Sequence, residues 1–299
     1  MNTPPPIAVP PRRILVVFNP AAGRARRARF EHVMTALRAH RCVVTLKETT
    51  APRHAESIAR DSSAMDFDII AAAGGDGTIN EVVNGLVGKN MPVGLIPLGT
   101  ANVLAREIGL RLTPKEIAHA LAYGPIKPIR VGRANERRFT MMAGVGFDAN
   151  VVANVSLPLK KRFGPFAYVW QGVAQAATDS FPNCDVIIDG ATHRAASVLV
   201  CKGSRYGGPF VAAPGVALGA DQFHVVLMQG RGWLSVLRYG VALVLGKLST
   251  LRDVTLVVGR EITVDGEAGQ PVQADGDILA RLPVHITIDP EPVRVVHPA

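Results

Sequence analysis

Short apolar runs alternate with stretches of helical spacing through the first hundred residues. Four of these runs have the length of buried strands: residues 14–18, 42–46, 68–71 and 93–97. Helices are predicted between and after them, at residues 24–40, 52–60 and 79–86 and beyond Asn102. Strands and helices that alternate at this spacing predict a parallel sheet. The loops after the strands then lie at one edge of the sheet, where open α/β sheets bind ligands.

The pattern changes near residues 125–130 to the alternation of β-strands with longer loops. Strands are predicted at residues 138–143, 184–188, 197–201, 223–227, 254–258 and 285–288. Two helical stretches interrupt them, at residues 164–180 and 233–248. The second part is therefore expected to be a mostly antiparallel β-sandwich. A last strand at residues 293–296 is a candidate to return to the first domain.

These changes divide the chain of 299 residues into a Pro-rich tail at 1–11, expected to be disordered, an α/β domain at 12–128 and a β-rich domain at 129–299. No apolar run reaches the ~18 residues of a membrane span. The first residues lack the basic and apolar regions of a secretory signal. Three scattered cysteines have neither metal-site nor disulfide spacing. The expected location is therefore the cytoplasm.

Basic residues outnumber acidic ones, which gives the chain a net charge of +9. Such a charge suits nucleic acid, anionic lipid or nucleotide phosphate as a partner. Aromatic residues make up only 5% of the chain, and no basic run is interleaved with them as a nucleic-acid stacking surface requires. Nucleic acid is therefore not expected, and peripheral contact with an anionic membrane, at its inner face, is favoured.

A glycine-rich segment follows the third predicted strand and reads Gly-Gly-Asp-Gly-Thr from Gly74 to Thr78. Glycines allow backbone N–H groups to approach a bulky anion, because no Cβ intervenes. The helix that follows adds the positive end of its dipole, so the segment is a candidate phosphate site. Asp76 repels phosphate and is therefore expected to orient a metal ion or a substrate hydroxyl. An ordinary strand–turn–helix corner is the alternative.

A second candidate for phosphate binding is the turn at residues 19–23, which joins the first strand to its helix. Four arginines open this helix: Arg24, Arg26, Arg27 and Arg29. Basic side chains at a helix start oppose the helix dipole, and an anion bound there would offset this effect. An exposed basic face is the alternative. After the fourth strand, Thr100 offers a further hydroxyl, for which helix capping is the alternative.

The Gly-Gly-Asp-Gly-Thr segment, continued by Ile79, Asn80 and Glu81, resembles the motif of the diacylglycerol-kinase-type lipid kinases, which include sphingoid-base kinases and bacterial relatives. NAD kinases share its first five residues. The Asn-Pro-x-x-Gly turn at 19–23, Pro-x-Gly-Thr-x-Asn at 97–102 and Gly-x-Gly-Phe-Asp at 144–148 also resemble the lipid kinases, in family order. The resemblance implies an NAD kinase/diacylglycerol kinase-like α/β domain followed by an antiparallel β-sandwich.

By this resemblance, ATP and Mg²⁺ are the expected cofactors. The residues implied in nucleotide binding are Asn19, Pro20, Gly23, Thr49, Gly74, Gly75, Asp76, Gly77, Thr78, Ile79, Asn80 and Thr100. Asp148 is expected to contact the substrate head group, with capping of the following helix as the alternative. Bacterial members hold a structural Mg²⁺ through one aspartate and two backbone carbonyls, which correspond to Asp221, Leu218 and Phe223. Gln222 replaces the usual glycine there, and an empty turn is the alternative.

Residues 273–277 lie where the family usually has Asp-Gly-Glu, whose carboxylates are proposed to accept the proton of the lipid hydroxyl. The base is then Asp277 or Asp275, and Asp277 is one methylene shorter than the usual glutamate. A literal Asp-Gly-Glu occurs at residues 265–267, but the order and spacing of the chain's last strands favour 273–277. Asp76 completes the expected catalytic set.

The expected function is transfer of the ATP γ-phosphate to the hydroxyl of a lipid such as diacylglycerol. Two alternatives are a kinase for NAD or another soluble acceptor, and a non-catalytic lipid- or nucleotide-binding module. The helix predicted at 233–248 carries only two charges, Arg238 and Lys247, and is expected to be buried. A wall of the lipid pocket or an interfacial helix is its alternative. Besides the lipid and a membrane surface, a second copy of the chain is a candidate partner.

Overall fold

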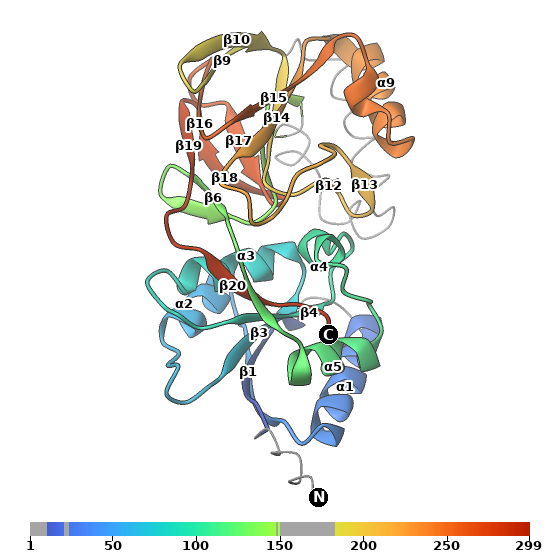
Figure 1. Cartoon of the computed structure of the whole chain (residues 1–299), viewed down its shortest axis with the longest axis vertical. Coiled ribbons are helices and arrows are strands. Elements are labelled where there is room, and N and C mark those ends of the chain that lie inside the picture. Colours follow the sequence, from blue (N-terminus) through green and yellow to red (C-terminus); the bar gives the residue numbers. More distant parts are fainter. Residues whose placement is uncertain (1–10, 21–23, 148, 150–182) are drawn as a thin grey trace, which may run out of the picture.

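Two domains are stacked along the long axis of the molecule (Figure 1). The structure is a computed structural model that describes residues 11–20, 24–147, 149 and 183–299. The chain leaves the α/β domain after β5 (Ile126–Ile129) and returns between β19 (Val284–Ile288) and β20 (Val293–Val296). The last strand therefore lies in the same sheet as the first, although the whole second domain separates them in the sequence.

The first sheet has six strands in the order β2-β1-β3-β4-β20-β5. Its remaining members are β1 (Arg13–Phe18), β2 (Val43–Glu48), β3 (Ile69–Gly74) and β4 (Val93–Pro97). All neighbours except β20 and β5 pair in parallel, which confirms the predicted parallel sheet. The central strands β1, β3 and β4 are almost wholly buried, as expected of apolar strands that helices cover on both faces.

Five helices cover this sheet: α1 (Arg24–Ala39), α2 (His54–Arg60), α3 (Asp76–Gly85), α4 (Val103–Glu107) and α5 (Pro114–Tyr123). The helix α1 packs against α5, and α2 packs against α3. Both α3 and α4 begin at the carboxyl edge of the sheet, on the side that faces the second domain (Figure 1). The loops after β3 and β4 therefore lie between the two domains.

Two six-stranded antiparallel sheets form the second domain, in the orders β10-β9-β16-β19-β6-β7 and β15-β14-β11-β8-β17-β18. Their strands are β6 (Gly132–Ala134), β7 (Arg137–Phe139), β8 (Met142–Val145), β9 (Cys184–Ile188), β10 (Ala191–Ala195), β11 (Ser197–Cys201), β14 (Phe223–Met228), β15 (Val254–Gly259), β16 (Glu261–Asp265), β17 (Pro271–Ala274) and β18 (Asp277–Arg281). Apolar side chains from both sheets form one core between them, with Phe139 and Phe223 stacked at its centre. The predicted antiparallel sandwich is confirmed.

Small elements lie beside the second sheet. They are the hairpin of β12 (Arg205–Tyr206) and β13 (Phe210–Val211), the helix α9 (Gly232–Val244) and a 3-10 turn at Leu248–Thr250. The helix α9 contacts both β13 and the 3-10 turn. Figure 1 shows α9 on the outside of the second domain, beyond the strands.

The prediction of a single strand at residues 138–143 is wrong. The chain changes sheets there, because β7 ends at Phe139 in one sheet and β8 begins at Met142 in the other. The side chain of Asp275 accepts hydrogen bonds from the backbone N–H groups of Thr140, Met141 and Met142, so a carboxylate takes the place of a neighbouring strand. The helix predicted at 164–180 lies outside the described residues.

Candidate active site

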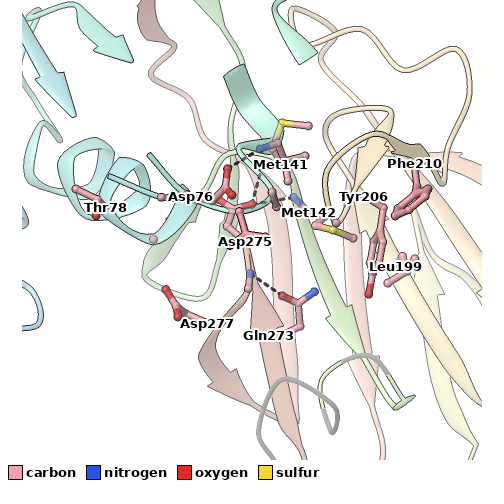
Figure 2. Close-up of a pocket in the computed structure, with 18 of the residues that line it drawn as sticks. Asp76, Thr78, Met141, Met142, Leu199, Tyr206, Phe210, Gln273, Asp275 and Asp277 are labelled. Carbon is pink, nitrogen blue, oxygen red and sulfur yellow. Dashed lines mark hydrogen bonds between the residues drawn. The ribbon is translucent and has the colours of Figure 1, made fainter. Parts of the chain in front are cut away.

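A cavity of about 1100 Å³ is lined by residues of both domains. Its α/β side consists of the loops after β1 to β4, and its other side consists of the second sheet, the β12–β13 hairpin and α9. Figure 2 shows Asp76 and Asp275 between Thr78 on the first side and Tyr206 and Phe210 on the other. The cavity therefore has a polar end and an apolar end, with carboxylates where the two ends meet.

The first turn of α3 forms the centre of the polar end. The helix begins at Asp76, directly after Gly75, which has no side chain with which to cap the first N–H groups. These N–H groups carry the positive end of the helix dipole and suit an anion. Nine residues predicted to bind nucleotide line the cavity: Asn19, Pro20, Thr49, Gly74, Gly75, Asp76, Gly77, Thr78 and Thr100.

Arg26 brings a positive charge to the same end of the cavity. It belongs to α1, whose first turn contains no acidic residue, and its guanidinium donates to Thr100 Oγ1 at 2.9 Å. Arg27 lies instead 3.7 Å from Glu48 at the surface. Among the arginines of this helix start whose side chains the structure describes, Arg26 lines the candidate phosphate site, while Gly23 lies outside the described residues.

Glycines in two loops allow protein groups to approach each other closely. A Cβ on Gly99 would lie 2.7 Å from the Cα of Gly75, so the loops after β3 and β4 meet backbone to backbone. A Cβ on Gly77 would lie 2.8 Å from Asp277 Oδ2, so that carboxylate lies against the first turn of α3. The glycines therefore bring the loops and an acid together, in addition to exposing N–H groups to a ligand.

Asp76 links the starts of two helices. Its Oδ1 accepts a hydrogen bond from the backbone N–H of Val103, in α4, at 2.7 Å. Burial raises the pKa of Asp76 to about 6, an effect that the Val103 N–H opposes and the nearby Asp275 carboxylate increases. A buried carboxylate beside a second one is stabilised by a hard cation, so Asp76 fits the role of a Mg²⁺ ligand.

Asp275 occupies the turn between β17 and β18, with a positive φ of 50°. Its Oδ2 accepts from Asn80 Nδ2 at 2.9 Å, from Thr140 N at 2.6 Å and from Thr140 Oγ1 at 2.9 Å. Its Oδ1 accepts from Met141 N at 2.9 Å and from Met142 N at 3.2 Å. Both oxygens are thus engaged in holding the turn. Asp277, two residues later, also lines the cavity, but it is exposed whereas Asp275 is half-buried, so the two acids have different surroundings.

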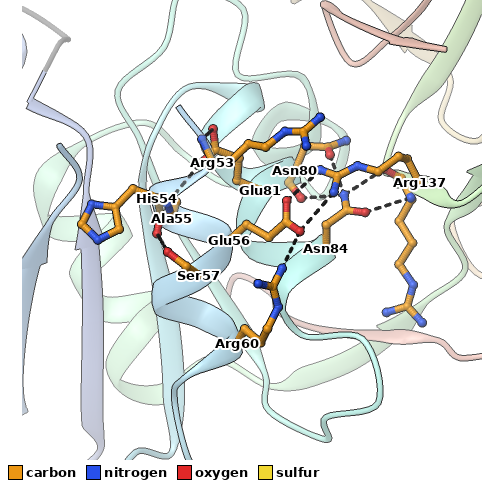
Figure 3. Close-up of polar contacts among 11 residues, drawn as sticks. Arg53, His54, Ala55, Glu56, Ser57, Arg60, Asn80, Glu81, Asn84 and Arg137 are labelled. Atoms are coloured by element: carbon orange, nitrogen blue, oxygen red, sulfur yellow. Dashed lines mark hydrogen bonds and ion pairs between the residues drawn. The ribbon is translucent and has the colours of Figure 1, made fainter. Parts of the chain in front are cut away.

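Ile79 and Asn80, which the sequence places among the nucleotide ligands, do not line the cavity. The Ile79 side chain is in the core, and the buried Asn80 amide donates to Asp275 across the domain boundary. Glu81 accepts from the backbone N–H groups of Arg53 and Ala55 at 3.0 and 3.1 Å, and so caps α2 (Figure 3). This end of the motif therefore positions its neighbours, a role that its residue types do not reveal in the sequence.

Further hydrogen bonds join the domains behind the cavity. Arg137 donates through both terminal nitrogens to the Glu56 carboxylate, at 3.1 and 2.8 Å (Figure 3). The side chain of Asn84 pairs with the backbone N–H and C=O of Arg138, each at 3.0 Å. Because these bonds connect α2 and α3 with β7, they hold the glycine-rich segment at a fixed position relative to the second domain.

The apolar end is formed by the second sheet, the hairpin and one side of α9. Its members include Leu199, Tyr206, Phe210, Met228, Val236, Tyr239, Leu243 and Val244. The prediction of a buried helix at 233–248 is wrong, because the helix ends at Val244 and has a second apolar side in solvent. Exposed fractions of 39–64% are found for Trp233, Leu234, Leu237, Val241 and Leu245. A helix that is apolar on both sides resembles a buried one in sequence alone.

The residues predicted to hold a structural Mg²⁺ lie before and in β14, away from the cavity. The Leu218 carbonyl accepts from Arg130 N at 2.8 Å, and Asp221 is exposed. Beside them, Lys202 is fully buried and donates to the carbonyl of Ala217 at 3.3 Å. Burial lowers the pKa of Lys202 to about 8, while Asp221 raises it and Arg130 lowers it.

An ammonium group near the Asp221 carboxylate repels a divalent cation, so the predicted structural Mg²⁺ site does not fit this chain. No cluster of three or more His, Cys, Asp or Glu side chains suited to a metal occurs in the described part of the chain. Asp148, the predicted substrate residue, lies outside the described residues.

A parallel α/β domain stacked on an antiparallel sandwich, with glycine-rich loops facing a shared cavity, defines the two-domain kinase fold of diacylglycerol and NAD kinases. The family described as "Diacylglycerol kinase catalytic domain" matches residues 13–134, and "YegS C-terminal NAD kinase beta sandwich-like domain" matches residues 141–297. The chain belongs to the diacylglycerol kinase-type lipid kinase family.

Individual relatives agree with this assignment. The chain is 27% identical over 281 residues to the diacylglycerol kinase of Bacillus subtilis. The matched region covers 91% of this chain and 92% of that protein. It is 35% identical over 135 residues to a probable lipid kinase YegS-like protein of Pseudomonas putida, covering 44% and 45%.

Solved structures show the same fold. A putative diacylglycerol kinase from Bacillus anthracis has a TM-score of 0.81 at 20% identity, covering 99% of this chain and 98% of that one. Yeast NADH kinase has a TM-score of 0.52 at 13% identity, covering 97% and 84%. Within the described residues, every helix is too short or too polar to span a membrane.

Proposed function

We propose that the protein is an ATP-dependent lipid kinase that transfers the γ-phosphate of ATP to the hydroxyl of a lipid such as diacylglycerol. The observation that carries the proposal is the cavity, which is continuous from the first turn of α3 to an apolar wall of sheet and helix. A triphosphate suits the first end, because N–H groups and Arg26 gather there. An acyl chain suits the second end, because apolar side chains such as Leu199, Phe210 and Leu243 line it.

The chain's own residues supply mainly positioning, which is what phosphoryl transfer requires of a protein. The N–H groups of the first α3 turn, with Arg26, hold the phosphates. Mg²⁺ bound with ATP neutralises charge on the phosphates, and Asp76 is the carboxylate that fits it. Asp76 accepts a hydrogen bond from the Val103 N–H of α4, and Glu81 accepts one from the Arg53 N–H before α2, and these bonds keep the surrounding loops in place.

In the transfer step, the lipid oxygen attacks the γ-phosphorus, and the bond between that phosphorus and the bridging oxygen of ADP breaks. The proton of the lipid hydroxyl passes to a carboxylate. Asp277 suits this role, because it lines the cavity and lies against Gly77 in the first turn of α3. Asp275 suits it less, because its two oxygens accept five hydrogen bonds from Asn80, Thr140, Met141 and Met142.

The proposal includes peripheral binding to an anionic membrane through α9. Large apolar side chains of this helix are exposed, as is that of its C-cap residue, Leu245, while other residues of the helix line the cavity. Four exposed basic residues lie in this helix or close to it in the sequence: Arg231, Arg238, which pairs with Asp253, Lys247 and Arg252. Apolar side chains with basic residues close by suit the interface of an anionic bilayer. A lipid that leaves such a bilayer at α9 is then next to the apolar end of the cavity.

The kinase activity is tested with γ-labelled ATP and three separate acceptors: diacylglycerol, a sphingoid base and NAD. A labelled lipid on thin-layer chromatography is the expected result, and the Asp277→Asn protein, prepared in parallel, controls for contaminating kinases. Label transferred only to NAD would identify a soluble-acceptor kinase. ATP binding in calorimetry without turnover on any acceptor would identify a non-catalytic module, and either outcome rejects the lipid kinase.

Membrane binding is tested by flotation with anionic and with neutral vesicles at low salt. The protein is expected to float with anionic vesicles, and a Leu234→Ser, Val241→Ser double variant is expected to lose this binding. A Val43→Ser, Met65→Ser variant is the matched control, because these apolar residues are also exposed but lie far from α9 in the sequence. Equal flotation of both variants would reject α9 as the contact.

A further inference from the structure

Lys202 is a buried charged residue that the proposed phosphoryl transfer does not use. It follows β11 directly, and its side chain is 0% exposed. Lysine is almost never fully buried unless its ammonium group has a partner. Since Lys202 does not line the cavity between the domains, its burial has another cause.

The Lys202 ammonium faces the loop that joins β13 to β14. Its Nζ donates to the Ala217 carbonyl at 3.3 Å, and the same carbonyl accepts from Ala220 N at 3.0 Å, which closes a turn. Asp221 follows this turn and lies close enough to act electrostatically on the ammonium. The next carbonyl in the turn, that of Leu218, accepts from Arg130 N at 2.8 Å. The turn is therefore held from one side by a side-chain cation and from the other by a backbone amide.

These groups overlap with the set that the family resemblance assigns to a structural Mg²⁺, namely the Asp221 carboxylate and the Leu218 carbonyl. Mg²⁺ requires near-octahedral oxygen ligands and retains several waters, whereas here a lysine chain fills the adjacent interior. A second cation close to the Lys202 ammonium would add repulsion. We propose that Lys202 is an internal cation that replaces the structural divalent ion and holds the turn at residues 217–221.

The position of this turn links it to the apolar end of the cavity. The turn lies between the hairpin that carries Tyr206 and Phe210 and the strand that ends in Met228, and these three residues line the cavity. Leu218, within the turn, packs against the large hydrophobic core. A turn held by a covalently attached charge fixes this wall without an exchangeable metal, so the wall is expected to be insensitive to chelators.

The test is thermal unfolding of the nucleotide-free protein in EDTA and in millimolar MgCl₂. The wild type is expected to unfold at the same temperature in both solutions. Lys202→Met keeps most of the side-chain volume but removes the charge, and is expected to lower the Tm in EDTA by several degrees. MgCl₂ is expected to restore part of this loss, because the oxygens of Asp221 and Ala217 no longer face an ammonium group. Lys115→Met, at an exposed lysine, is the control and should respond like the wild type.

A second variant keeps the test decisive if Lys202→Met fails to fold. Asp221→Asn is expected to lower the Tm equally in EDTA and in MgCl₂, because it weakens the interaction with Lys202 and removes no metal ligand. The proposal is wrong if MgCl₂ raises the Tm of the wild type and Asp221→Asn abolishes that rise. It is also wrong if Lys202→Met is as stable as the wild type. Because Asp221→Asn leaves Asp76 unchanged, a rise in Tm with MgCl₂ that this variant retains comes from Mg²⁺ bound at Asp76.

Discussion

Replacing the two acids of the β17–β18 turn one at a time separates the proposed base from the residue that supports it. In Asp275→Asn, one carboxylate oxygen becomes an NH₂ group. If the NH₂ takes the place of Oδ1, the amides of Met141 and Met142 lose their acceptor. If it takes the place of Oδ2, Asn80 Nδ2 and the Thr140 amide lose theirs. Either orientation leaves two N–H donors unsatisfied in the interior.

Each unsatisfied buried donor costs about 1–3 kcal/mol, so Asp275→Asn is expected to lower the free energy of unfolding by about 2–6 kcal/mol. Asp277→Asn changes an exposed side chain and is expected to alter stability by less than about 0.5 kcal/mol. Its effect falls on catalysis instead, where loss of a positioned base lowers kcat by about 10²- to 10⁴-fold.

Urea unfolding followed by circular dichroism measures the first effect, and initial rates at saturating ATP measure the second. Rates are taken at a temperature where both variants remain folded. Glu267→Gln is the matched control, because it belongs to the literal Asp-Gly-Glu at 265–267 and is exposed. It should leave stability and rate unchanged. A stable Asp275→Asn, an Asp277→Asn that keeps its rate within a few-fold, or an inactive Glu267→Gln would refute the assignment of roles.

Two further variants test the polar end of the cavity and the domain contact. Asp76→Asn is expected to lower kcat far more than ATP affinity, and equal losses in both would contradict its proposed role. Because the pKa of Asp76 is raised to about 6 in the folded protein, unfolding of the wild type releases a proton between about pH 4 and pH 6. The free energy of unfolding therefore decreases as the pH rises through that range. The nucleotide-free Asp76→Asn protein lacks this loss. Measured by urea unfolding, its free energy of unfolding minus that of the wild type should be about 3 kcal/mol larger at pH 8 than at pH 3. The same difference at both pH values would exclude the raised pKa. Arg137→Met leaves the Glu56 carboxylate with fewer partners and should cost about 1–3 kcal/mol of stability at neutral pH, whereas Arg194→Met, which removes an exposed ion pair with Asp185, should cost less than about 1 kcal/mol.

Local sequence pattern is enough to place most of the strands and the loops of the polar end. The strands β1, β3 and β4 are continuous apolar runs, because helices cover the sheet on both faces. The glycines after β3 mark the corner between a strand and a helix, where bare backbone N–H groups are accessible. These features depend on neighbouring residues, and the sequence therefore reveals them directly.

The same reasoning fails where a side chain acts on a distant segment. Asn80 has the residue type of a phosphate ligand, yet it donates to Asp275, which is 195 residues away in the sequence. That bond, with the amides of Thr140 and Met141, turns a predicted strand into two strands in different sheets. The apolar spacing of α9 is compatible with burial, and only the neighbouring elements determine that one side faces the cavity and the other faces solvent.

The two-domain architecture and the glycine-rich corner could be predicted before the fold was known, because apolar periodicity and glycine act over a few residues. Only the folded chain shows which acid supports the turn, which acid is exposed in the cavity, and that a buried lysine lies near Asp221. Burial, hydrogen-bond partners and local charge arise from segments that meet only after folding. For this reason the residue types at positions 202, 275 and 277 do not specify their roles before the chain has folded.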